Sequence, residues 1–248
     1  ATTDGGAGLL EALGARIRDA SGADVSPGGG GLGAVASIDL TGLSEVLSEV
    51  HVIVASDVTN PLLGEHGAAA VYGPQKGASA EQVAELDRNL KRYAEVMEGT
   101  IGRPLRYEPG SGAAGGAIFG LLAMADRFAS LEVRPGVEVA MELTGFDEAV
   151  AAADLVLTGE GKVDGQTSFG KTAMGVAERA RDAGARTICF GGGVTPEGAE
   201  FMHSMGVITM PVTERPMTLY EIAAAGTAPI ARAAGRAASL LDLGSTLL

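Results

Sequence analysis

A chain of 248 residues, 46% of them hydrophobic, is long enough to form one large domain or two modest ones around a hydrophobic core, without a disulfide or a metal for support. The formal net charge of −13 argues against nucleic acids and anionic membranes as partners, because both are bound by basic surfaces. Gly, Pro or charged residues interrupt every apolar run before it is long enough to span a bilayer. The single cysteine, Cys189, cannot form an internal disulfide, which favours a reducing, cytoplasmic location.

The first half of the chain is predicted to form three helices and one strand. Hydrophobic patterning predicts a helix over residues 6–20 and a short apolar strand over residues 51–56. A Ser and a Gln with capping-box spacing open a long helix over residues 79–97. A further helix, with a glycine-rich beginning, is predicted over residues 112–128.

The second half alternates strands with helices. Strands are predicted over residues 154–159, 186–192 and 206–210, and helices over residues 146–153, 171–183, 196–204 and from 218 onward. Such alternation forms a right-handed parallel sheet, so we expect an α/β protein. A boundary near Thr144 gives two lobes, residues 1–144 and 145–248. Because three strands leave sheet edges exposed, we expect a further segment or a second copy to complete the second lobe.

Three predicted loops follow strands, where open α/β sheets bind their ligands. The first covers residues 56–61. Its Asp57 and Asn60 could coordinate Mg²⁺ or hydrogen-bond a hydroxyl group. The alternative is an Asx turn that only stabilises the loop, because Asp and Asn form such turns routinely.

The second loop, residues 158–172, places Glu160, Lys162, Asp164 and Lys171 among glycines. Carboxylates can hold Mg²⁺ or accept a proton, while lysines and backbone N–H groups can bind phosphate oxygens. The loop also fits the P-loop formula, but a P-loop begins where its strand ends, and here several residues intervene. The alternative to a functional loop is a charged surface loop.

The remaining candidates are glycine tracts. The third loop, residues 191–193, is expected to be either a turn that faces a phosphate or merely a tight turn. Two clusters open helices, one containing Asp4 and the other containing Gly115 and Gly116. A helix N-terminus without side chains suits an anion such as a carboxylate, but small residues also permit close helix packing, and both interpretations stay open. Lys76 is expected to be a turn residue or a substrate contact.

Four strings resemble signatures of the bacterial-type glycerate kinase family. They are TTDGGAGLLEALG (residues 2–14), ASDVTNPLLGEHGAAAVYGPQKGA (55–78), GSGAAGG (110–116) and DLVLTGEGKVDGQTSFGK (154–171). Their order and rough spacing also match, and the resemblance covers essentially the whole chain. Several long, unusual strings in the right order are more specific than any single glycine motif.

The resemblance implies ATP-dependent phosphorylation of D-glycerate with Mg²⁺, giving 2-phosphoglycerate in most members of the family, with 3-phosphoglycerate as the other product. It also implies two unlike α/β lobes with the site between them. Residues 1–144 correspond to the middle, restriction-enzyme-like lobe, and residues 145–248 to part of a flavodoxin-like parallel sheet. The family begins with a strand and a loop of the pattern APDSFKGS, which this sequence lacks, so an N-terminal segment is an expected partner.

The candidate residues and the family resemblance together give one mechanistic hypothesis. Asp164 orients or deprotonates the glycerate hydroxyl, and Asp57 and Glu160 hold Mg²⁺ or assist catalysis. Substrate or phosphate binding is expected of Lys171, Gly165, Gly170, Asn60, Asp4, Gly115 and Gly116. The alternative function is a non-catalytic module that binds a hydroxy acid or a nucleotide, or an incomplete fragment that needs an N-terminal partner chain.

Overall fold

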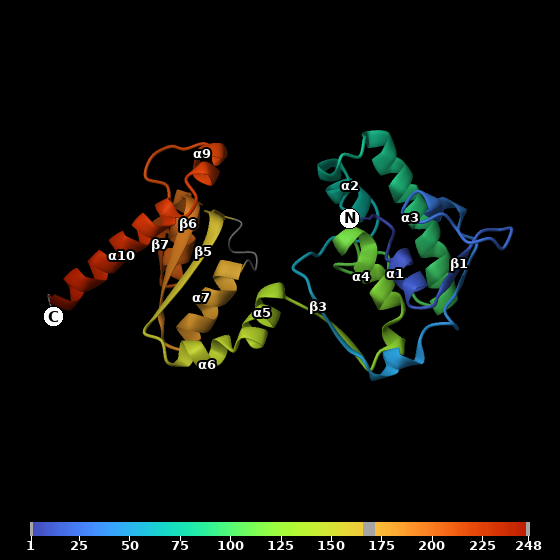
Figure 1. The fold of residues 1–248 in the computed structure, drawn as a ribbon, viewed down its shortest axis with the longest axis horizontal. Coiled ribbons are helices and arrows are strands. Elements are labelled where there is room, and N and C mark those ends of the chain that lie inside the picture. Colours follow the sequence, from blue (N-terminus) through green and yellow to red (C-terminus); the bar gives the residue numbers. More distant parts are fainter. Residues whose placement is uncertain (1, 166–171, 247–248) are drawn as a thin grey trace. The chain divides into compact units, whose positions relative to one another are not determined.

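The computed structural model describes residues 2–165 and 172–246. The chain divides into two compact units, Ala1–Arg134 and Pro135–Leu248 (Figure 1). Helices combined with parallel strands confirm the predicted α/β class.

The division falls before the predicted boundary near Thr144. Helix α5 (Gly136–Thr144) belongs to unit 2, because it packs against helix α7 (Thr172–Asp182). The contact is close: a methyl group added at Gly175 of α7 would lie 2.9 Å from a side-chain carbon of Val137. Packing between two helices therefore sets the boundary.

Unit 1 combines helices with two small sheets. Its helices are α1 (Ala7–Ala12), α2 (Ala68–Tyr72), α3 (Ala80–Ile101) and α4 (Ala113–Ala123), with short 3-10 helices η1 (Gly31–Ala34), η2 (Glu45–Glu49), η3 (Pro74–Lys76) and η4 (Ala125–Arg127). Strands β1 (Arg16–Arg18) and β2 (Ser37–Asp39) pair antiparallel, and β3 (His51–Ala55) and β4 (Ser130–Arg134) pair parallel. These elements enclose one core, whose largest fully buried side chains include Leu10, Ile17, Tyr93, Met97 and Phe119.

The capping box predicted for α3 is confirmed. The Ser79 hydroxyl accepts a hydrogen bond from the Gln82 N–H, and the Gln82 side chain accepts one from the Ser79 N–H at 2.9 Å. The helix ends at Ile101 and is capped by Gly102, whose left-handed φ of 73° closes the last turn.

The helix predicted over residues 6–20 is wrong, because α1 ends at Ala12. Gly14 has a φ of 110°, and a side chain there would lie 2.2 Å from the Gly42 carbonyl oxygen. The chain turns at this glycine and continues as β1. Strand β4 was absent from the sequence prediction, because its five residues carry only two apolar side chains and its partner β3 lies far away in the sequence.

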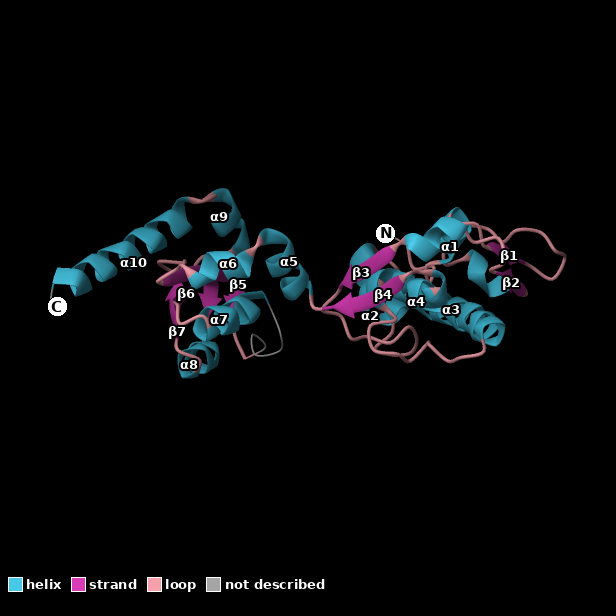
Figure 2. Cartoon of the chain, turned by 90° about the horizontal axis from the view of Figure 1, so that it is seen from below, coloured by secondary structure: helices cyan, strands magenta, loops and turns pink. Residues whose placement is uncertain are grey.

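Unit 2 is a three-stranded parallel sheet with helices on both faces (Figure 2). The strand order is β5 (Leu155–Val163), β6 (Arg186–Val194), β7 (Val207–Pro211). One face packs on α7 and α8 (Pro196–Ser204) through residues that include Cys189. The other face packs on α10 (Ala228–Thr246) through Ile188 and Phe190. The remaining helices are α6 (Phe146–Ala151) and α9 (Leu219–Ala224).

Strands β5 and β6 are longer than predicted. Both continue through stretches that the sequence assigns to loops, and the two strands pair as far as Val163 and Val194. Val163 is fully buried and anchors the end of β5. Glu160 therefore lies within a strand, and residues 191–193 form a strand rather than a phosphate-facing turn.

A half-buried ion pair joins α3 to the loop that follows it. One carboxylate oxygen of Glu98 accepts the N–H groups of Leu105 and Arg106, both at 2.8 Å, and the other pairs with the Arg106 guanidinium. Burial acts to raise the pKa of Glu98, but the Arg106 side chain and the two N–H groups outweigh it and hold that pKa below its usual range.

We expect Glu98→Gln to lower the free energy of unfolding by about 1–3 kcal/mol at pH 7, because it removes a charged acceptor from three donors. The folded-state pKa is depressed, so the contribution of Glu98 is complete above the ordinary carboxyl pKa of 4.5 and disappears as the pH falls through the folded value. Urea unfolding of the variant and the wild type at pH 7 and at pH 4 measures the loss of unfolding free energy and its dependence on pH. Glu49→Gln, at an exposed position, is the control. An equal loss for the two variants would contradict the role of Glu98.

Candidate functional site

Three segments of unit 1 that are distant in sequence meet around a glycine-rich turn. The Gly5 N–H donates to the Gly115 carbonyl at 3.0 Å, and the Gly112 N–H donates to the Asn60 carbonyl at 2.9 Å. Asp4 directly precedes the first of these contacts. The structure therefore brings together four of the predicted binding residues, Asp4, Asn60, Gly115 and Gly116.

Asp4 organises the start of α1. The residue is 8% exposed, and its carboxylate accepts hydrogen bonds from the hydroxyl of Thr2 at 3.2 Å and from the N–H groups of Gly6 and Gly8 at 3.1 and 3.2 Å. These bonds satisfy N–H groups that have no partner at a helix N-terminus. Asp4 thus fixes the course of the turn over residues 2–8.

Gly115 and Gly116 are required by close packing. Their φ values are 72° and 89°, and Ala114 before them is also left-handed at 52°. A methyl group at Gly115 would lie 2.0 Å from the Thr2 carbonyl oxygen, and one at Gly116 would lie 2.7 Å from the Gly5 Cα atom. Of the two interpretations that the sequence left open, the packing role is observed.

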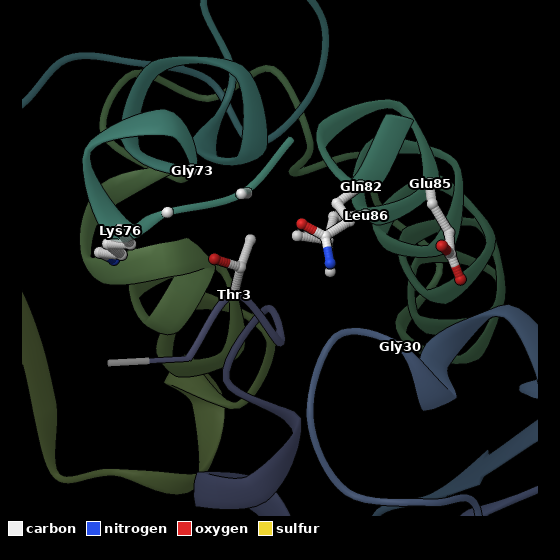
Figure 3. A pocket seen from close by; sticks show the side chains of 9 residues that line it. Thr3, Gly30, Gly73, Lys76, Gln82, Glu85 and Leu86 are labelled. Atoms are coloured by element: carbon white, nitrogen blue, oxygen red, sulfur yellow. The ribbon is translucent and has the colours of Figure 1, made fainter. Parts of the chain in front are cut away.

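A pocket of about 440 Å³ lies beside this turn (Figure 3). Thr3 comes from the turn, Lys76 ends η3, and Gln82, Glu85 and Leu86 belong to the first turns of α3. Its lining residues are Thr3, Gly30, Gly73, Lys76, Gly77, Ala78, Gln82, Glu85 and Leu86. An ammonium group, a hydroxyl and an amide around one small cavity can bind a small molecule that carries a carboxylate and hydroxyl groups.

The pocket contains residues that sequence reasoning did not place in the site. Thr3 lies in the signature string of residues 2–14, next to the candidate Asp4, but is not itself among the predicted binding residues, and Glu85 carries no motif signal. Gln82 was predicted only as part of a helix cap, and that cap uses its carbonyl oxygen, which leaves its amide hydrogens for other partners. Lys76 ends η3 and lines the pocket, and its role as a substrate contact stays a prediction.

The side chain of Asn60 stabilises its loop. Its carbonyl oxygen accepts the Tyr72 hydroxyl at 2.9 Å, and its amide nitrogen donates to the His66 carbonyl at 2.8 Å. Both ends of the amide are therefore engaged within the protein, which favours the loop-stabilising interpretation. Asp57 lies exposed, two residues beyond the end of β3.

Unit 2 places carboxylates near the carboxyl end of β5. The Lys162 ammonium lies 3.1 Å from a carboxylate oxygen of Asp164, whose side chain is 19% exposed. Glu160 pairs across the sheet with Gly191. Burial and then the charge of Glu160 raise the pKa of Cys189 to about 11, so this thiol stays protonated. Gly165 follows as an exposed turn residue.

The predicted phosphate-binding residues Gly170 and Lys171 lie outside the described residues. The predicted metal ligands are divided, because Asp57 belongs to unit 1 and Glu160 to unit 2. Within residues 2–165 and 172–246, no group of three or more His, Cys, Asp or Glu side chains could hold a metal ion. Mg²⁺ at a kinase site needs only one or two carboxylates, because phosphates and water supply the other ligands. The carboxylates present therefore fit Mg²⁺ only together with a bound phosphate.

Comparison with known proteins places these features in one family. The model of the glycerate kinase family matches residues 1–242. A glycerate kinase from Bacillus subtilis (strain 168) is 42% identical over 209 residues, and the match covers 84% of this chain and 54% of that protein. A glycerate 2-kinase from Escherichia coli (strain K12) is 40% identical over 209 residues, with the same coverage of 84% and 54%.

A solved structure agrees with the sequence comparison. A candidate glycerate kinase 2 from Salmonella typhimurium LT2 superposes with a TM-score of 0.76 at 39% identity, covering 99% of this chain and 63% of that one. The chain spans about half the length of the curated relatives it matches. No helix in the described part of the chain is both long and apolar enough to cross a membrane. With 42% identity to a glycerate kinase and a family match along nearly its whole length, the chain belongs to the glycerate kinase family.

Proposed function

We propose that this chain is part of a glycerate kinase that transfers the γ-phosphoryl group of ATP to D-glycerate, giving 2-phosphoglycerate. The observation that carries the proposal is the pocket of unit 1, where the Lys76 ammonium and the Thr3 hydroxyl line a cavity of about 440 Å³. Family membership supplies the reaction class, and the pocket supplies groups that suit a small hydroxy acid.

The polar groups of the pocket match the functional groups of D-glycerate. Its carboxylate pairs with the Lys76 ammonium in a charge-assisted hydrogen bond. Its hydroxyl groups bond to the Thr3 hydroxyl and the Gln82 amide, and the acceptor oxygens of Glu85 bind a hydroxyl hydrogen. Fixing three groups of the acid at once orients the hydroxyl that receives the phosphoryl group, and orientation is the largest part of what a kinase supplies.

Three carboxylates are candidates for the transfer, Asp164 and Glu160 of unit 2 and Asp57 of unit 1. We assign Asp164 to orienting or deprotonating the reacting hydroxyl, with its carboxylate held in place by Lys162. Glu160 and Asp57 are the candidate ligands of Mg²⁺, which would neutralise charge on the phosphates. Phosphate binding by Gly165, Gly170 and Lys171 stays a prediction.

An exposed apolar side chain on each edge strand of the sheet of unit 2 supports the expectation of a further segment or a second copy. Leu157, Ile188 and Ile208 are register partners across the three strands. Helix α10 packs on Ile188, which is 4% exposed, whereas Leu157 and Ile208 are 56% and 58% exposed. A partner along one edge strand would bury the exposed side chain there and cover that sheet edge.

An ADP-release assay tests the function. We expect D-glycerate-dependent ADP release from the full-length gene product, and little from the 248 residues alone until the remaining segment is added. The same samples titrated with ATP–Mg²⁺ and with D-glycerate in a calorimeter test the alternative. Binding of either ligand without turnover in the full-length protein would favour the non-catalytic module.

The pocket assignment predicts the effect of Lys76→Met. We expect the KM for D-glycerate to rise about 10- to 100-fold, because the variant loses a charged hydrogen bond worth about 1.5–3 kcal/mol. The KM for ATP should stay within about twofold. Lys91→Met, an exposed lysine further along α3, is the matched control. An unchanged D-glycerate KM in the folded Lys76 variant would remove this residue from the site.

The catalytic assignment predicts the effect of Asp164→Asn. We expect kcat to fall at least about a hundredfold, the scale of a positioned acid–base group, while the melting temperature changes little. Asp154→Asn is the control, because this exposed aspartate immediately precedes the opposite end of β5. Near-normal turnover by Asp164→Asn would show that another group orients the hydroxyl.

A further inference from the structure

The glycine turn, residues 28–31, forms one wall of the pocket of unit 1. Gly30 lines the cavity on the opposite side from Lys76 (Figure 3). Gly29 is buried against the segment that carries the pocket hydroxyl, because a methyl group at Gly29 would lie 2.1 Å from the Thr3 carbonyl oxygen. The position of the glycine turn therefore affects two parts of the pocket wall at once.

The glycine turn has no side chain with which to fix itself. Its four residues are all glycine, the residue that loses the most conformational freedom on folding. Gly28 has a left-handed φ of 86°, and the Gly31 N–H donates to the Gly28 carbonyl at 3.1 Å. Holding such a turn at a pocket wall requires contacts from another part of the chain.

The side chain of Asn89 supplies these contacts from helix α3. Its amide nitrogen donates to the carbonyl oxygens of Gly29 and Gly30, both at 3.1 Å. A primary amide has two N–H donors, so it can bind both carbonyls at once. Leu86, three residues earlier on the same face of α3, also packs on Gly29, where a methyl group would lie 2.6 Å from the leucine Cδ2 atom. Asn89 thus ties the residue that packs on Thr3 and the residue that lines the cavity to one helix.

Gly33 leaves the room that this amide occupies. A methyl group at Gly33 would lie 2.5 Å from the Asn89 Oδ1 atom, and the next two atoms that it would meet, Cγ and Nδ2, belong to the same amide. Gly33 lies within η1 and outside the left-handed region, so its backbone would accept an alanine. The lack of a side chain at this position is therefore explained by the Asn89 amide.

We propose that Asn89 is a positioning residue for D-glycerate binding. Its amide holds the glycine turn in place, and the turn keeps Gly30 and the Thr3 segment where they form the pocket wall. Asn89 is not among the residues that line the cavity, so it acts on the acid through the turn rather than by contact. The effect on D-glycerate rests on the proposed function, whereas the hold of Asn89 on the glycine turn does not.

The first test compares Asn89→Ala with Arg92→Met in the full-length gene product. Arg92 follows three residues later on α3, and its Nε atom donates to the Val35 carbonyl at 2.8 Å, so both variants lose hydrogen bonding from α3 to the same segment of the chain. Val35 does not line the pocket. We expect the D-glycerate KM to rise about tenfold in the Asn89 variant, with kcat and the ATP KM within about twofold of the wild type, and to stay unchanged in the Arg92 variant.

Amide hydrogen exchange gives a readout that needs no ligand. We expect the Gly31 N–H to exchange about tenfold faster in Asn89→Ala than in the wild type, because the turn opens more often, and at the wild-type rate in Arg92→Met. Gly33→Ala displaces the Asn89 amide and should give the same faster exchange. In the double variant, Gly33→Ala should add nothing to Asn89→Ala, because the amide that it displaces is already absent.

An unchanged Gly31 exchange rate in Asn89→Ala, or additive effects of the two alanine substitutions, would overturn the hold of Asn89 on the glycine turn. A D-glycerate KM that is unchanged in Asn89→Ala, or that rises equally in Arg92→Met, would overturn the positioning role. A wild-type protein that neither binds nor phosphorylates D-glycerate would contradict the proposed function and with it the role in D-glycerate binding. The exchange rates would still decide whether Asn89 holds the turn.

Discussion

The backbone over residues 2–6 passes so close to Gly115 and Gly116 that no side chain fits between them, and the pocket of unit 1 depends on this contact. A third glycine also packs against this segment, because a methyl group at Gly29 would lie 2.1 Å from the Thr3 carbonyl oxygen. Thr3 is therefore held between two glycine tracts. Close packing and ligand binding are often treated as rival explanations for a glycine cluster. Here the packing is what places Thr3 on the pocket wall.

The left-handed run at Ala114, Gly115 and Gly116 shows how firmly this arrangement is imposed. A non-glycine residue with a φ of 52° carries a cost of about 1–3 kcal/mol. That conformation persists because the glycines after it are locked against the 2–6 backbone. Strain of this kind tends to occur at functional sites, and here it lies next to the segment that carries Asp4 and Thr3.

Unit 2 uses its glycines differently. Residues 159, 161 and 191–193 are glycines, and they lie in extended strands rather than in loops. Without side chains, the strands can approach neighbouring backbone closely: a methyl group at Gly192 would lie 2.5 Å from the Gly161 carbonyl oxygen. The strands consequently continue far enough to bring Glu160 and Asp164 toward the carboxyl end of the sheet, where parallel α/β sheets bind ligands.

Local sequence was sufficient for several parts of this protein. The α/β class, the capping box of α3, the three strands of unit 2 and the family itself follow from patterns within short stretches, because periodicity, caps and signature strings are local properties. The hydrogen bond from the Gly5 N–H to the Gly115 carbonyl brings two of the signature strings together, and this contact between distant segments is not a local property.

Other features were decided only by tertiary structure. Helix α1 ends early because Gly14 packs on Gly42, and β4 forms because β3 offers it a partner. The pocket joins Thr3 to Lys76 and Gln82, which lie more than seventy residues further along the chain. No local pattern encodes these contacts, since each arises from burial and steric fit between segments that meet only when the chain is folded.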